Sequence, residues 1–170
     1  VLLKIALTYL LTPDDLGLFT MTLVFFAILS SFIDIGLEKS LVQRSRDNLT
    51  SSIHSFVFWC ILIFSCFIAF LFATIGSYLL QIIYSDDRFG SIAMVMSIGI
   101  VFQSMMLLPV VQFTRIQKFK SIVIADCAGL SAGFILALMM AKNGFGVWSL
   151  VANHLVWLFV KLVFLWIQSS

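Results

Sequence analysis

The segment "SIVIADCAGLSAGFILALMMA" (residues 121–141) is an apolar run that contains a single charged residue, Asp126. A helix needs about 20 apolar residues to cross the hydrocarbon core of a bilayer, so the run is long enough to span it. The strict alternation typical of barrel strands does not appear, and in lipid the backbone must satisfy its own hydrogen bonds. The segment therefore predicts a transmembrane helix.

Small residues recur at every fourth position of this segment. The set is Ala125, Gly129, Gly133, Ala137 and Ala141. Residues four apart lie on one face of a helix, and small side chains let helices approach closely in lipid. We expect this face to pack against a neighbouring helix in the middle of a bundle, and packing alone explains the pattern.

The composition extends this interpretation to the whole chain. Of 170 residues, 62% are hydrophobic and only 11% are charged, whereas a soluble domain carries about 25% charged residues. The sequence predicts an all-α, polytopic membrane helix bundle that forms one unit over residues 1–170. Since the chain starts without Met on a short apolar run, we expect its first span to be truncated. The predicted spans are 1–11, 16–41, 53–84, 91–113, 121–141 and 147–168.

The loops between these spans carry unequal charge. Six basic residues lie on one side of the membrane and two on the other. They are Lys39, Arg44, Arg46, Arg115, Lys118 and Lys120 against Arg88 and Lys142. Basic residues concentrate in cytoplasmic loops, so loops 42–52 and 114–120 are predicted to be cytoplasmic. The segments "TPDD" (12–15), "SDDRFG" (85–90) and "KNGFG" (142–146) then face outward. In the first, Thr12 is a candidate helix cap before Pro13.

The sequence shows no combination of residues typical of an enzyme. His54 and His154 are far apart in the chain, and Cys60, Cys66 and Cys127 lie inside apolar runs without metal-ligand spacing. We expect no catalytic residues, no metal, no cofactor and no nucleic acid partner. The surroundings of the chain are predicted to be the lipid bilayer.

Two acidic residues of the spans are candidate functional groups, because intramembrane acids are costly. Asp34, with Glu38 one turn later, either caps the cytoplasmic end of its span or faces a cavity as a proton- or cation-responsive carboxylate. Asp126 borders the small-residue face. It either pairs with a partner such as a lysine on a neighbouring helix or takes part in transport.

The last span carries a polar face. His154, Trp157, Lys161 and Gln168 follow one another at helical spacing, and Asn153 lies beside them. Counted from Gln168, Lys161 lies about 10 Å deep at 1.5 Å per residue. It either snorkels to the interface or faces a cavity, and the polar face favours the cavity. Lys4, Gln103 and Gln112 are further candidates to face the interior.

Four segments, in order, resemble one known family. They are "LLTPDDLGLF" (10–19), "FIDIGLEKSLVQR" (32–44), "QFTRIQKFKSI" (112–122) and "GFGVWSLV" (144–151). Together they resemble the polysaccharide-transporter branch of the multidrug/oligosaccharidyl-lipid/polysaccharide exporter superfamily. One departure is Leu16, where this branch usually has an aromatic residue.

The resemblance implies two six-helix bundles around a central cavity, of which this chain is the N-terminal one. It implies alternating access that flips a polyprenyl-pyrophosphate-linked oligosaccharide across a bacterial inner membrane, for O-antigen, capsule or exopolysaccharide assembly. The partner would be a C-terminal bundle of the same protein. Alternatives are a drug or cation exporter of the same superfamily, a membrane-embedded enzyme of the pathway, or a scaffold.

Such a substrate suggests roles for the residues chosen by depth and face. Lys161 and Lys4 are candidate contacts to the head group, and Trp157 is a candidate for stacking on a sugar. Asp34 and Asp126 are candidate coupling or structural carboxylates. The remaining candidates to line the cavity are Asn153, His154, Gln103 and Gln112.

Overall fold

The computed structural model describes residues 11–34, 51–84, 86 and 88–169, and every regular element in these ranges is helical. The helices are α2 (Pro13–Asp34), α4 (Ser51–Leu71), α5 (Ser77–Tyr84), α6 (Arg88–Arg115), α7 (Phe119–Lys142) and α8 (Val147–Ser169). A π-helical turn, Phe72–Gly76, joins α4 to α5 into one continuous span. Within the described residues, five helical spans are long and apolar enough to cross a membrane. The predicted class, an all-helical polytopic bundle, is confirmed.

The start of α2 shows how the local sequence sets a helix boundary. The Thr12 hydroxyl donates to Asp15 Oδ2 at 2.8 Å, and the Asp15 backbone N–H donates back to Thr12 Oγ1 at 3.3 Å. This capping lets α2 begin at Pro13, three residues before the predicted start at Leu16. Residues 1–10 of the first predicted span and residues 35–41 of the second lie outside the described residues.

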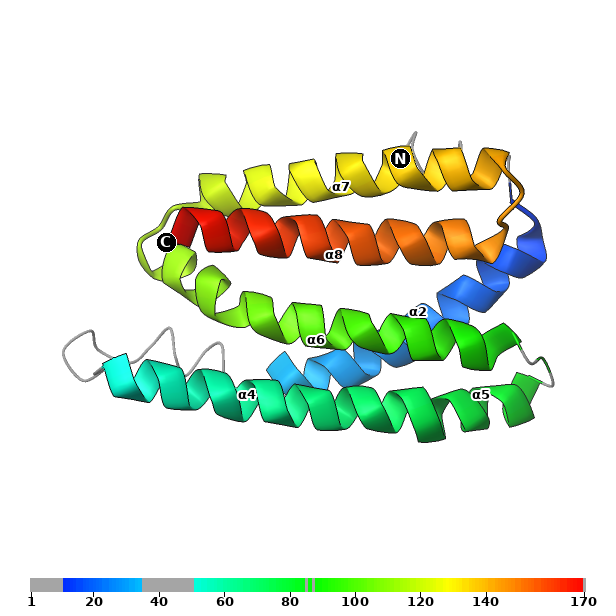
Figure 1. Cartoon of the computed structure of the whole chain (residues 1–170), viewed down its shortest axis with the longest axis horizontal. Coiled ribbons are helices and arrows are strands. Elements are labelled where there is room, and N and C mark those ends of the chain that lie inside the picture. The colour runs from blue at the N-terminus through cyan, green and yellow to red at the C-terminus, as the bar shows by residue number, and fades with distance from the viewer. Residues whose placement is uncertain (1–10, 35–50, 85, 87, 170) are drawn as a thin grey trace.

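The helices run side by side in a flattened bundle (Figure 1). One end, which we call the Arg88 end, holds the starts of α2, α6 and α8. The opposite Phe119 end holds the starts of α4 and α7. The described turns near residues 12–15, 86–90 and 142–146 therefore share one end, and the 116–118 turn lies at the other. Successive turns thus lie at alternate ends of the bundle, as expected when each helix crosses it once. The assignment of the Phe119 end to the cytoplasm remains a prediction.

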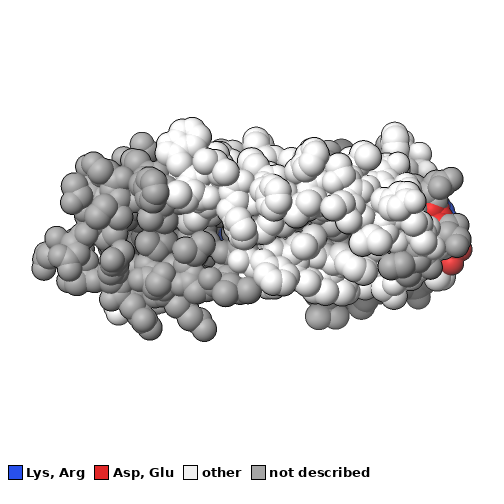
Figure 2. All heavy atoms as spheres, turned by 90° about the horizontal axis from the view of Figure 1, so that it is seen from below, with Lys and Arg blue, Asp and Glu red and all other residues white. Residues whose placement is uncertain are grey.

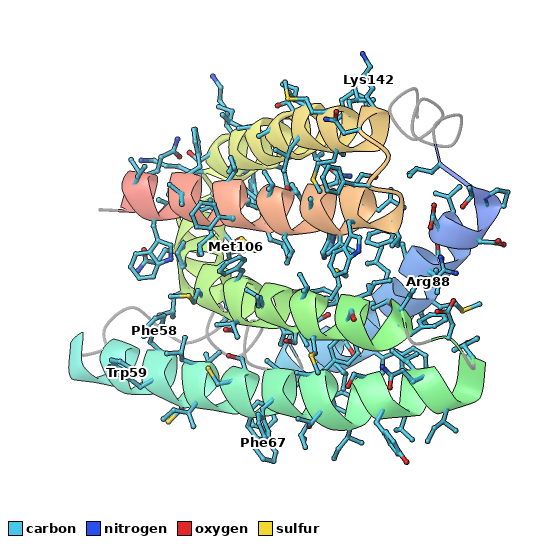
Figure 3. All side chains as sticks on the ribbon, turned by 45° about the vertical axis from the view of Figure 1, so that its right-hand side comes forward. Phe58, Trp59, Phe67, Arg88, Met106 and Lys142 are labelled. Carbon is cyan, nitrogen blue, oxygen red and sulfur yellow. The ribbon has the colours of Figure 1, made fainter. Side chains whose placement is uncertain are left out.

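The helix α6 is central: α4, α5, α2 and α8 pack against it, while α7 packs mainly on α8. Ile92, Ala93, Met96 and Ile100 of α6 have no exposed surface. Large apolar side chains point outward elsewhere, such as Phe67, which extends away from the bundle (Figure 3). On one face of the molecule the described surface is almost free of charged residues, which gather at one end (Figure 2). An outer surface of this kind suits contact with lipid acyl chains.

Among the described helices, α7 and α8 share the most extensive contact, through the predicted small-residue face, whose five members are all buried. A Cβ added at Gly129 would lie 2.7 Å from the Trp157 carbonyl oxygen. A Cβ added at Gly133 would lie 2.6 Å from the Asn153 carbonyl oxygen. Both distances are shorter than side-chain carbons tolerate, so glycine at these positions sets the separation of the two helices.

Candidate functional site

A cavity of about 340 Å³ lies between α2, α6 and α8. Each helix contributes residues three or four positions apart, which places them on one face. Its polar members are Ser30, Gln103, His154 and Lys161, and the rest of the lining is apolar or aromatic. The apolar and aromatic members are Leu23, Phe26, Ala27, Met106, Leu107, Val110, Trp157 and Leu158. Figure 3 shows Met106 directed into the space between α6 and α8.

At the side of this cavity, Lys161 forms an ion pair with α7. Its Nζ lies 2.8 Å from Asp126 Oδ1, and the side chains are 16% and 36% exposed, respectively. The Trp157 indole Nε1–H donates to the same oxygen at 3.2 Å. The ammonium also lies 5.6 Å from the centre of the Trp157 ring, within the range of a cation–π interaction. Asp126 therefore holds both Lys161 and Trp157 in place, and Lys161 does not need to reach an interface to be neutralised.

The close packing of α7 on α8 makes this pair possible. A Cβ at Gly129 would lie 2.8 Å from Trp157 Cδ1 and 3.5 Å from the Lys161 backbone nitrogen. Gly129 thus lies beside the two residues that bind Asp126, which is three residues earlier on α7. The small-residue face consequently has a second effect, since it brings a carboxylate within bonding distance of a lysine inside the membrane span.

His154 belongs to an aromatic wall of the cavity. Its ring lies edge-on to Phe26 at 5.1 Å, Trp157 at 5.5 Å and Phe19 at 6.4 Å between centroids. Its Nε2 is buried and has no hydrogen-bond partner among the described residues. The wall therefore combines flat apolar surfaces with one imidazole, which suits ring-shaped ligands that carry polar edges.

A second group of charges lies at the Arg88 end, away from the cavity. The Arg88 guanidinium binds Asp86 at 2.9 Å and approaches Asp15 of α2 at 3.9 Å. The side-chain and backbone hydrogen bonds from Arg88 hold the pKa of the Asp86 carboxyl below its usual value. Arg88 is exposed and Asp86 is partly exposed, and the contacts of Arg88 connect the 86–88 turn to the start of α2 at the Arg88 end.

The structure brings some of the predicted site residues together and separates others. Lys161, Trp157, His154 and Gln103 line the cavity. Asn153 does not line it, since its side chain lies against Gly133 of α7. Gln112 is exposed on α6 and does not line it either. Lys4 lies outside the described residues, and for Asp34 the structure describes only the backbone at the end of α2.

Apart from Asp34, the sequence did not lead us to expect residues of α2 in the cavity. Phe26 and Ser30 lie one helical turn apart and face α6 and α8 across it. A weak signal was present, since Ser30 and Ser31 are the two polar residues in the otherwise apolar run 23–33. The choice of Lys161 as the partner of Asp126 required the structure, because spacing within one helix says nothing about a neighbour on another.

These features define a class: a multi-pass membrane protein with a partly polar cavity and a cation held within its apolar layer. The model of the polysaccharide biosynthesis protein family matches residues 6–170, nearly the whole chain. The chain belongs to this family, which confirms the resemblance carried by its four motifs and places its role in polysaccharide transport or biosynthesis. No curated protein and no solved structure matched the chain.

Proposed function

We propose that this chain is one lobe of a flippase that moves a polyprenyl-pyrophosphate-linked oligosaccharide across the membrane by alternating access. The observation that carries the proposal is Lys161, a cation on the wall of a cavity inside the membrane spans. A charge at this depth is unfavourable unless it pairs or functions. Arginine or lysine is the usual partner for a phosphate group, so the cavity suits an anionic head group.

The other walls of the cavity fit the same substrate. Trp157, Phe26 and His154 present aromatic faces and edges, and sugar rings pack their apolar faces on such surfaces. Gln103 contributes an amide to the lining, and the Ser30 hydroxyl, which donates to the Ala27 carbonyl, keeps an oxygen that accepts from a sugar hydroxyl. The cavity alone is too small for an oligosaccharide, so we propose that a second bundle completes it. We also propose that the protein acts in a cytoplasmic membrane.

A transporter explains the cavity better than an enzyme does. The cavity contains one imidazole and one ammonium, and the nearest carboxylate among the described side chains, Asp126, is already engaged by Lys161. His154 is the one described group of the lining that is free for general acid–base catalysis, and no described carboxylate lines the cavity beside it to orient or assist the imidazole. We therefore propose transport without catalysis, and a drug or cation exporter remains the alternative that the following experiment separates.

The test is flipping of a fluorescent polyprenyl-pyrophosphate oligosaccharide in proteoliposomes that contain the intact protein. Lys161→Ala should reduce the rate at least about tenfold, which corresponds to about 1.4 kcal/mol. Lys161→Arg, which keeps the charge, should retain most of the rate. If Lys161→Ala flips the substrate as fast as the wild type, the head-group role is wrong. Transport of organic cations in place of the lipid-linked sugar would support the alternative.

A further inference from the structure

The ammonium of Lys161 lies between the cavity and a carboxylate of the same chain. Lys161 lines the cavity from α8, whereas Asp126 binds it from α7 and does not contribute to the lining. With 2.8 Å between Nζ and Oδ1, the positive charge of Lys161 is already balanced by Asp126 before any ligand enters. An anionic ligand that binds Lys161 therefore competes with Asp126 for this charge.

Displacement would leave Asp126 in an unfavourable state. Among the described residues, its remaining hydrogen bond would come from the Trp157 indole, a neutral donor. An ionised carboxylate that loses its cation inside an apolar layer is strongly destabilised, and such groups are neutralised by protonation instead. Without a ligand, the apolar surroundings favour the ion pair between Asp126 and Lys161. With a ligand on Lys161, the same surroundings favour the protonated form of Asp126.

We infer that Asp126 takes up a proton when an anionic ligand binds Lys161, so that the anion and the proton bind together. This inference rests on the proposed head-group role of Lys161. In the exchange, one negative charge of the ligand replaces Asp126 as the partner of Lys161. Asp126 takes one proton from water and becomes a neutral carboxylic acid. The net charge of the site stays zero, because the proton that binds Asp126 balances the negative charge of the bound ligand.

No other described charged group takes the place of Lys161. The structure describes other charged or titratable side chains on α7, on α8, and on α6 and α2, which pack on α8. These side chains lie at helix ends, next to Asp126 in sequence, or in the aromatic wall. They are Lys120, Cys127 and Lys142 on α7, His154 on α8, Arg88 on α6, and Asp14 and Asp15 on α2. Among the described residues, the one ion pair of Asp126 is with Lys161.

The experiment counts protons during binding. Inorganic pyrophosphate is titrated calorimetrically into the intact protein in phosphatidylcholine nanodiscs, in buffers that differ in ionisation enthalpy. A second arm uses geranyl pyrophosphate, which separates a lipid head group from a free phosphate as the ligand. The matched control is Asp126→Asn, whose amide oxygen still accepts the Trp157 N–H but which cannot take up a proton. Asp126→Glu restores a titratable group.

The inference predicts that the wild type and Asp126→Glu take up about one proton more per ligand than Asp126→Asn. The ratio of the wild-type affinity to the Asp126→Asn affinity should rise about tenfold for each pH unit lowered. Equal proton uptake in all three proteins would overturn the inference, since the three donors of Lys161 would then hold both anions. Absence of binding to the wild type, or equal binding to Lys161→Ala, would instead overturn the head-group role itself.

Discussion

Gly133→Ala tests the packing on which the site depends. The added Cβ would lie 2.6 Å from the Asn153 carbonyl oxygen, and ordinary contact begins at 3.4 Å. The helices α7 and α8 must therefore separate by about 0.8 Å at this point, because backbone atoms cannot turn aside as a side chain does. Overpacking of this kind costs about 1–3 kcal/mol, and alanine recovers up to about 1 kcal/mol through its helix propensity. With the full recovery of about 1 kcal/mol, the expected net destabilisation is about 0–2 kcal/mol.

The assay is reversible unfolding in mixed micelles, followed by far-ultraviolet circular dichroism. The control is Gly17→Ala on α2, where nothing lies within 4 Å of the added Cβ. This variant should be as stable as the wild type or more stable, since only the propensity changes. If Gly133→Ala matches Gly17→Ala in stability, the close approach of α7 and α8 does not exist as described.

Three further predictions concern other parts of the molecule. The buried hydroxyls of Ser65 and Ser104 lie 2.8 Å apart between α4 and α6, so a double-mutant cycle with alanine should give a coupling energy of about 0.6 kcal/mol; additive single losses would contradict the bond. The Asp86 carboxyl has a lowered pKa because of the guanidinium beside it, so its stabilising effect is present above about pH 4 and is lost as the pH falls below that. The melting temperature of Asp86→Asn should fall less on acidification than that of the wild type. The same pH dependence in both proteins would rule out the effect. Single cysteines at the exposed Lys118 and Asn143 should react with an impermeant thiol reagent from opposite sides of the membrane, the former from the cytoplasm; labelling from one side would contradict the topology.

The sequence predicts the helices well because the bilayer imposes one simple requirement. The apolar length of each span is visible in the residues themselves, and α7 and α8 lie within about two residues of the predicted ranges 121–141 and 147–168. The spacing of small residues likewise identifies the face of α7 that packs most closely. Local patterns carry these features, and so no knowledge of the neighbours is needed.

The contents of the cavity depend on how the helices meet, which local patterns do not contain. The polar face of α8 divides in the structure: His154, Trp157 and Lys161 line the cavity, while Asn153 turns toward Gly133. Adjacent residues on a helix point about 100° apart, so one helix contacts two environments. Gln112 shows the same limit, since a polar residue near a helix end faces outward as readily as inward.

The most direct test of the account is whether the ligand occupies the cavity that Lys161 lines. Ser30→Cys places a thiol on the α2 wall of that cavity, in a background where Cys60, Cys66 and Cys127 are replaced by alanine. Geranyl pyrophosphate should slow the reaction of this thiol with a small water-soluble reagent, and the protection should disappear when Lys161→Ala is added. Protection that persists without the Lys161 charge, or a reaction rate that the ligand leaves unchanged, would contradict the account.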